Sequence, residues 1–224
     1  MGYSIDLKQI SLQKYMEMLK NQNLLPGRRI LLDELEAKFQ RMAGADIRNL
    51  FELKSSLSSP QKLSAFAAKT DISEDYLVIL KRELGSLEQK PVPISDFPGI
   101  SKQTILKLSE HNIKTSKALY SLFLTEGDME AISGKTGISR NELDELYCLC
   151  NLVRINGVGA AAARTMYESG YKDIAEIAAA DAGDLLKRIS EVNSVGHYYN
   201  AKLGKKDTQF VIDFAILLLN IERS

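Results

Sequence analysis

A five-residue pattern occurs twice in this chain, and its repetition constrains the fold more than any other feature. Lys69-Thr70-Asp71-Ile72-Ser73 returns 66 residues later as Lys135-Thr136-Gly137-Ile138-Ser139. Each copy is followed by apolar residues at helical spacing, first around Leu77 to Leu84 and then around Leu143 to Leu149. A repeated segment of this kind predicts that one helical unit is repeated about three times along the chain.

A glycine-rich turn at Ile155-Asn156-Gly157-Val158-Gly159 precedes a run of alanines that starts at Ala160. Phe97-Pro98-Gly99-Ile100-Ser101-Lys102 is a weaker copy of it, and Leu25-Pro26-Gly27 matches it more loosely. A Gly-apolar-Gly turn that opens a helix points free backbone N–H groups at the positive end of that helix. The sequence therefore predicts an anion site at Gly157, Val158, Gly159 and Ala160. The alternative is a structural turn whose glycines let two helices approach each other.

Capping signals predict many short helices. Gly44, Asn112 and Gly170 are expected to close helices in the left-handed conformation. Ser139 with Glu142 reads as a capping box, and Ser59-Pro60 as a cap before a first-turn proline. The other predicted N-terminal caps are Asp46, Thr115, Asp173 and Asp181. Because the apolar spacing is helical and no convincing period-2 pattern occurs, the predicted class is all-α.

Proline and polar stretches suggest where the chain divides. Residues 89–93, Gln-Lys-Pro-Val-Pro, form a stiff linker that no helix can cross. We expect a helical region over 1–90 with a degenerate unit, paired units over 91–193, and a polar loop from Asn193 to Lys206 before a final helix over 208–222. That helix is too short in its apolar part to span a membrane. Asp213 interrupts it, and its apolar face offers a homodimer seam made of Phe210, Phe214, Leu217, Leu218 and Ile221.

The balance of acidic and basic residues limits which partners the chain is expected to bind. The chain carries 29 acidic and 29 basic residues, so its formal net charge is zero, which counts against strong non-specific DNA binding. Cys148 and Cys150 lie two positions apart in a predicted helix, so a mutual disulfide is not expected. Reduced thiols and an N-terminus without a signal pattern predict a cytoplasmic protein.

The run from Thr136-Gly137-Ile138-Ser139 through Arg154-Ile155-Asn156-Gly157-Val158-Gly159 to Glu191-Val192-Asn193 resembles the helix-hairpin-helix superfamily. More closely, it resembles an uncharacterised bacterial and archaeal domain family related to that superfamily. The likeness covers roughly 96–193, with a degenerate copy over 24–84.

The resemblance implies tandem hairpins whose backbone amides hold DNA phosphates. Gly157 and Gly159 match the turn glycines, and Ala160 begins the phosphate-facing helix. The family's usual Lys or Arg after the second glycine is replaced by alanines, so the first cation is Arg164. In the second copy Gly99 is retained, Ser101 replaces the second glycine and Lys102 follows it.

Two functional classes remain open. The first is a non-enzymatic module that contacts nucleic-acid phosphates without reading sequence, with Arg154 and Arg164 assisting the turn. Lys202, Lys205 and Lys206, beside Tyr198 and Tyr199, are further basic candidates. The second is a protein-interaction or scaffold module that has lost DNA binding. No zinc spacing, nucleophile context or strand-flanked dinucleotide fingerprint occurs, so we expect no metal, no cofactor and no catalysis.

Overall fold

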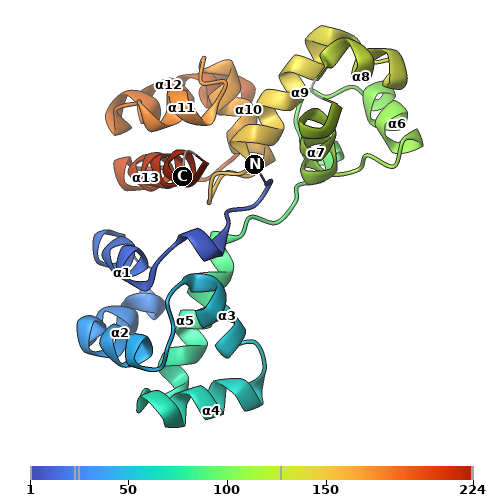
Figure 1. Cartoon of the computed structure of the whole chain (residues 1–224). Helices are drawn as coiled ribbons and strands as arrows, with labels where there is room; N and C mark the ends of the chain where they lie inside the picture. The colour runs from blue at the N-terminus through green and yellow to red at the C-terminus, as the bar shows by residue number, and fades with distance from the viewer. Residues whose placement is uncertain (1, 23, 25, 127, 223–224) are drawn as a thin grey trace. The chain divides into compact units, whose positions relative to one another are not determined.

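Helices are the regular secondary structure of the described residues, and turns and short loops connect them. This computed structural model describes residues 2–22, 24, 26–126 and 128–222. Within those ranges it contains α-helices and short 3-10 helices and no strand, which confirms the all-α prediction (Figure 1). Two isolated β-bridges pair Ser11 with Asn49 and Pro93 with Thr115.

The chain folds into two compact units. The N-terminal unit comprises Ile5–Glu88, and the C-terminal unit comprises residues 2–4 together with 89–222. This division falls beside the proline-containing linker, close to the boundary expected at residue 90. The elements of the N-terminal unit are η1 (Leu7–Gln9), α1 (Leu12–Asn21), η2 (Pro26–Leu32), α2 (Leu35–Gly44), α3 (Leu50–Ser56), α4 (Pro60–Thr70) and α5 (Glu74–Leu87).

In the C-terminal unit, α7, α8 and α9 pack against one another, α10 packs on α9 and α12, and α13 packs on α11 and α12 (Figure 1). The predicted boundary at residue 193 has no counterpart, because α13 shares one compact unit with these helices. The elements are η3 (Ile94–Asp96), α6 (Lys102–Glu110), α7 (Ser116–Glu126), α8 (Met129–Thr136), α9 (Arg140–Leu152), α10 (Ala160–Glu168), α11 (Ile174–Ala178), α12 (Ala182–Gly196) and α13 (Lys205–Glu222).

The sequence repeat is a repeat of structure. In both copies a helix ends at a threonine whose hydroxyl donates to the carbonyl four residues earlier, Thr70 to Phe66 and Thr136 to Ile132. A left-handed residue follows, Asp71 (φ 53°) in one copy and Gly137 (φ 64°) in the other. A serine then caps the next helix. The 66-residue offset therefore joins equivalent helix-turn-helix corners, one in each unit.

Most predicted caps are present. Ser139 and Glu142 form the capping box, and Ser59, Thr115, Asp173 and Asp181 each accept a bond from an N–H in the first turn of their helix. Asp46 is the exception, because it is itself the left-handed residue (φ 68°). Asn49 caps α3 instead, by accepting from the Glu52 N–H at 3.0 Å. Gly44 is correspondingly the last residue of α2 and not the left-handed position.

Two other sequence expectations are corrected. Pro26 and Gly27 begin the 3-10 helix η2, and Gly27 has no positive φ, so they do not form a third glycine turn; Leu25 lies outside the described residues. The polar loop expected over 193–206 is shorter, because α12 continues to Gly196 and α13 begins at Lys205.

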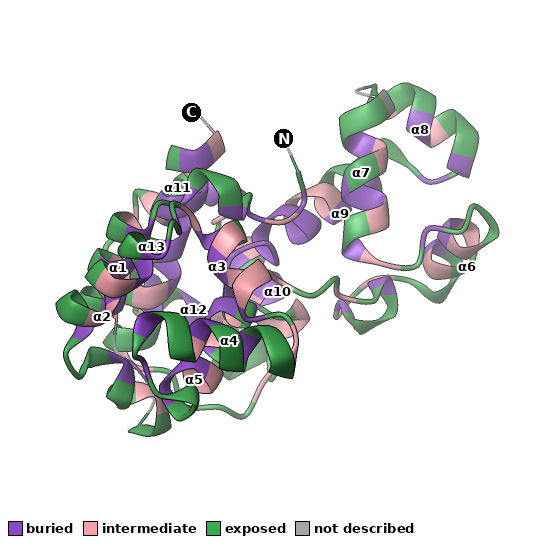
Figure 2. Ribbon diagram, turned by 60° about the horizontal axis from the view of Figure 1, so that its bottom comes forward, coloured by how far each residue is buried: buried purple, intermediate pink, exposed green. Residues whose placement is uncertain are grey.

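The apolar face of α13 is buried within its own chain. Phe214, Leu217, Leu218 and Ile221 are at most 7% exposed, and the helix packs on α11 and α12 (Figure 2). The predicted homodimer seam on this face is therefore wrong, because intramolecular packing already covers it. Asp213 lies on the exposed stripe of the helix, where it accepts from the Gln209 side chain at 2.9 Å.

Candidate functional site

The turn before α10 has the geometry of an open helix N-terminus. Gly157 adopts φ +85°, and the Val158 N–H donates to the Ile155 carbonyl at 3.1 Å. Val158 is buried, while Gly157 and Gly159 are exposed. Gly159 is the N-cap residue and brings no side chain to cap the helix, whose first backbone bond runs from the Ala163 N–H to the Gly159 carbonyl. The N–H groups of residues 160–162 therefore face outward without a side-chain acceptor.

The turn before α6 has the same backbone but a different cap. Gly99 adopts φ +84°, and the Ile100 N–H donates to the Phe97 carbonyl at 3.4 Å. Here the Ser101 hydroxyl oxygen accepts from the Thr104 N–H at 3.0 Å, so Ser101 serves as an internal cap. Lys102, the first residue of the helix, is exposed.

A carboxylate lies beside this second turn. The Thr104 hydroxyl donates to Glu142 at 2.8 Å, and hydrogen bonds from Ser139 and Thr104 lower the pKa of the Glu142 carboxyl. A negative charge at this position disfavours a phosphate. Of the two predicted turns, only the one at Gly157 to Ala160 keeps an uncapped helix start and is the stronger candidate, while the role of Gly99, Ser101 and Lys102 as anion ligands stays a prediction.

Arg154 is a structural residue and not a free cation. Its side chain is 3% exposed. Its Nε donates to the Tyr3 carbonyl at 3.1 Å, and Nη1 donates to the Tyr120 hydroxyl and to Asn151 Oδ1, both at 2.8 Å. Its Nη2 pairs with Glu222. The prediction that Arg154 assists a phosphate is therefore wrong, because burial and internal acceptors already hold its charge.

Arg164 is also engaged internally. Its side chain is 5% exposed, Nε donates to the Pro98 carbonyl at 2.6 Å, and Nη2 pairs with Glu145 at 2.6 Å. The guanidinium packs against Gly99, where a Cβ would lie 3.2 Å from its Nη2. Arg164 thus joins α10 to the turn before α6, and the second predicted phosphate cation is also corrected.

Gln89 contacts the α10 turn and was not found from the sequence. Its side-chain amide lies against Asn156, and with its oxygen turned to the backbone it accepts from the Gly157 N–H at 3.0 Å. The interaction spans 67 residues, and no local pattern marks it. Because Gln89 occupies amides at the apex of the turn, the first turn of α10 is the part left open to an anion.

The candidate binding residues predicted between α12 and α13 and at the start of α13 divide into two groups. Tyr198 donates to the Glu168 carboxylate at 2.8 Å, and the Tyr199 backbone is bonded to the Asn193 side chain, so both tyrosines are half-buried and engaged. Lys202, Lys205 and Lys206 are exposed. Phe210 packs on Gly157, with 3.4 Å between a Cβ built there and Phe210 Cε1. Lys206 lies one helical turn before Phe210 on the same face of α13.

The described part of the chain contains neither a metal-binding cluster nor a membrane-spanning helix. No group of three or more His, Cys, Asp or Glu residues there is placed to hold a metal ion. Cys148 and Cys150 are free thiols, as predicted, and burial raises the pKa of the Cys150 thiol. No described helix is long and apolar enough to cross a membrane.

Part of the chain is similar to a known protein family. Residues 98–202 match a family described as a domain of unknown function (DUF4332), a stretch that runs from the turn before α6 past the end of α12. It contains both glycine turns and overlaps the region 96–193 whose resemblance the sequence had indicated. No curated protein and no solved structure matches the chain.

Proposed function

We propose that this protein is a non-enzymatic binding module that contacts nucleic-acid phosphates, without sequence preference, through the first turn of α10. The observation that carries the proposal is the uncapped start of α10, beside an exposed Gly159 in a turn that resembles helix-hairpin-helix turns. Backbone N–H groups and the helix dipole together favour a negatively charged group there. Contacts of this kind position a protein on nucleic acid but do not read bases.

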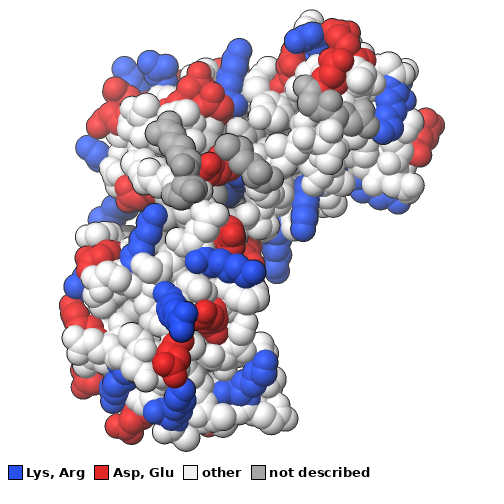
Figure 3. Space-filling model, viewed as in Figure 1, with Lys and Arg blue, Asp and Glu red and all other residues white. Residues whose placement is uncertain are grey.

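The charges of the protein favour weak binding that involves only a few phosphates. Both buried arginines are neutralised internally, and the formal net charge is zero. On the face seen in Figure 3, basic and acidic side chains are interspersed. Exposed Lys206, one turn from the Phe210 contact with Gly157, is the cation best placed to assist. If one or two phosphates are neutralised, log K should fall with log salt with a slope of about −1 to −2.

The proposal is tested with a fluorescently labelled duplex of mixed sequence, titrated at about 50 and 200 mM salt. Ala161→Glu places a carboxylate in the first turn of α10, where it repels phosphate and agrees with the helix dipole, so the helix is retained. We expect about tenfold weaker binding, which corresponds to about 1.4 kcal/mol.

The matched control is Gln103→Glu, which introduces the same carboxylate at the equivalent position of α6. It should leave the affinity unchanged, because that turn is capped by Ser101 and lies beside Glu142. Absent binding at the lower salt concentration, salt-insensitive binding, or equal losses in the two variants contradict the proposal.

A second candidate is a protein-interaction module that has kept the fold without phosphate binding. The engagement of both Arg154 and Arg164 inside the protein favours it. Val195 on α12 is 83% exposed and offers an apolar contact away from the buried face of α13. Under this alternative the duplex does not bind at either salt concentration.

A further inference from the structure

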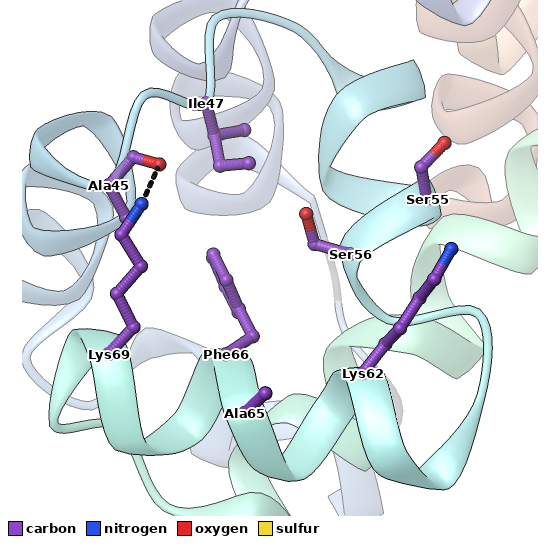
Figure 4. A pocket seen from close by; sticks show the side chains of 8 residues that line it. All are labelled: Ala45, Ile47, Ser55, Ser56, Lys62, Ala65, Phe66 and Lys69. Atoms are coloured by element: carbon purple, nitrogen blue, oxygen red, sulfur yellow. Dashed lines mark hydrogen bonds between the residues drawn. The ribbon is translucent and has the colours of Figure 1, made fainter.

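A pocket lies within the N-terminal unit, apart from the α10 turn. It is formed by α3, α4 and the loop after α2, and it is an open depression with a volume of about 360 Å³. Ile47 and Phe66 form an apolar floor and are 8% and 6% exposed. Figure 4 shows Phe66 in the middle of the pocket, with Lys62 on one side and Lys69 on the other. A volume of a few hundred Å³ over an apolar floor suits a small organic molecule.

The polar groups of the pocket favour an anion. The Lys69 ammonium already donates to the Ala45 carbonyl at 3.0 Å. The Lys62 ammonium and the Ser55 hydroxyl bond to no other side chain or backbone group in the described residues, and both line the pocket. None of its lining residues is an aspartate or glutamate. The pocket therefore offers an unpaired positive charge beside apolar surface.

The position of Lys62 in its helix strengthens this reading. Ser59 caps α4 by accepting from the Lys62 N–H at 3.2 Å, so Lys62 occupies the third position of the helix. A cation there opposes the helix dipole, and a glutamate would complete a capping box, as Glu142 does with Ser139 in α9. The fold therefore does not require a positive charge at this position.

We propose that this pocket binds a small organic anion. The anionic head group, a carboxylate or a phosphate, lies at Lys62 beside the Ser55 hydroxyl. The aromatic or branched aliphatic body lies on Phe66 and Ile47. This site is independent of the α10 turn and takes a free small molecule rather than a polymer.

The experiment titrates the full-length ¹⁵N-labelled protein with phenyl phosphate and follows backbone amide shifts. We expect saturable shifts within residues 45–69. Inorganic phosphate, which lacks the body, and benzyl alcohol, which lacks the charge, should each bind about tenfold more weakly. A response at residues 159–163 reports the α10 turn separately, so failure at one site is distinguishable from failure at the other.

Lys62→Glu is the test variant, because it completes a capping box with Ser59 and so preserves α4 while reversing the charge. It should weaken phenyl phosphate binding about tenfold. Lys14→Glu is the matched control. Lys14 holds the same position in α1, where its N–H donates to the Ser11 cap at 3.2 Å, and it does not line the pocket. An unchanged affinity in Lys62→Glu, an equal loss in Lys14→Glu, or inorganic phosphate binding as tightly as phenyl phosphate overturns the proposal.

Discussion

Arg154 ties four segments of the C-terminal unit to one guanidinium. Its acceptors are the Tyr3 carbonyl, the Tyr120 hydroxyl on α7, Asn151 at the end of α9, and Glu222 at the end of α13. The planar guanidinium also lies 4.6 Å from the Tyr120 ring centroid. Burying a charge is costly unless it is paired and fully hydrogen-bonded. Arg154 meets both conditions, so its loss leaves several buried groups without partners.

Replacing Arg154 with methionine should therefore destabilise the protein strongly. Methionine fills much of the volume but leaves the Glu222 carboxylate and the Tyr3 carbonyl unsatisfied, which costs about 3–5 kcal/mol. Urea denaturation followed by circular dichroism measures the change in the free energy of unfolding.

Arg140, the first residue of α9, provides the control. It pairs with Glu130 and Asp144 at an exposed site, where an ion pair contributes little, so Arg140→Met should change the stability only slightly. Equal effects of the two substitutions would show that Arg154 is not the link described above.

Sequence reasoning identified Arg154 and Arg164 as notable but assigned them the wrong role. A cation next to a glycine turn reads as a ligand for phosphate when only neighbouring residues are visible. The acceptors that engage Arg154 lie as far as 152 positions away, and those of Arg164 as far as 66. Partners at such separations leave no local pattern, so the burial of these charges was not predictable from the sequence.

At the scale of single elements, local signals predicted the structure well. Caps such as Asp173 and Asp181 depend on residues two or three positions away, so the sequence contains the whole interaction. The prediction that Asp46 is a helix cap failed because aspartate also tolerates the left-handed conformation, and Asn49 caps the helix instead. Gly157 and Gly159 of the α10 turn were identified from the same kind of local pattern. Gly157 holds the left-handed turn conformation and Gly159 is the N-cap of α10, and substitutions can test these two roles separately.

Gly157→Ala should destabilise the α10 turn. A left-handed backbone costs a non-glycine residue about 1–2 kcal/mol, and the added Cβ would lie 3.4 Å from the Phe210 ring. Gly159→Ala should cost less than about 1 kcal/mol, because φ is −90° there and no atom lies within 4 Å of the new Cβ. Denaturation midpoints of the two variants measure the difference, and a larger loss for Gly159→Ala would refute the assigned geometry.

At the scale of the whole molecule, the repeat and the linker were visible in the sequence, while the assignment of the first residues was not. The offset of 66 joins Thr70 to Thr136 and Asn49 to Thr115, and Asn49 and Thr115 each take part in an isolated β-bridge. Residues 2–4 nevertheless belong to the C-terminal unit. Tyr3 is 4% exposed and shares a 2.6 Å hydrogen bond with Ser116, which begins α7. A contact across 113 positions has no signature in the composition of either segment.

Because residues 2–4 belong to the C-terminal unit, substitutions of the buried Tyr3 and Tyr15 should each loosen a different unit. Tyr3→Ala opens a cavity beside Tyr120, and losses of about 3–5 kcal/mol are usual for removing a buried aromatic side chain. Hydrogen exchange should therefore accelerate in peptides from 89–222 and stay unchanged in those from 5–88. Tyr15→Ala, at a 1% exposed site beside Phe39, should do the reverse. If Tyr3→Ala accelerates exchange over 5–88 as much as over 89–222, the first residues do not belong to the C-terminal unit alone.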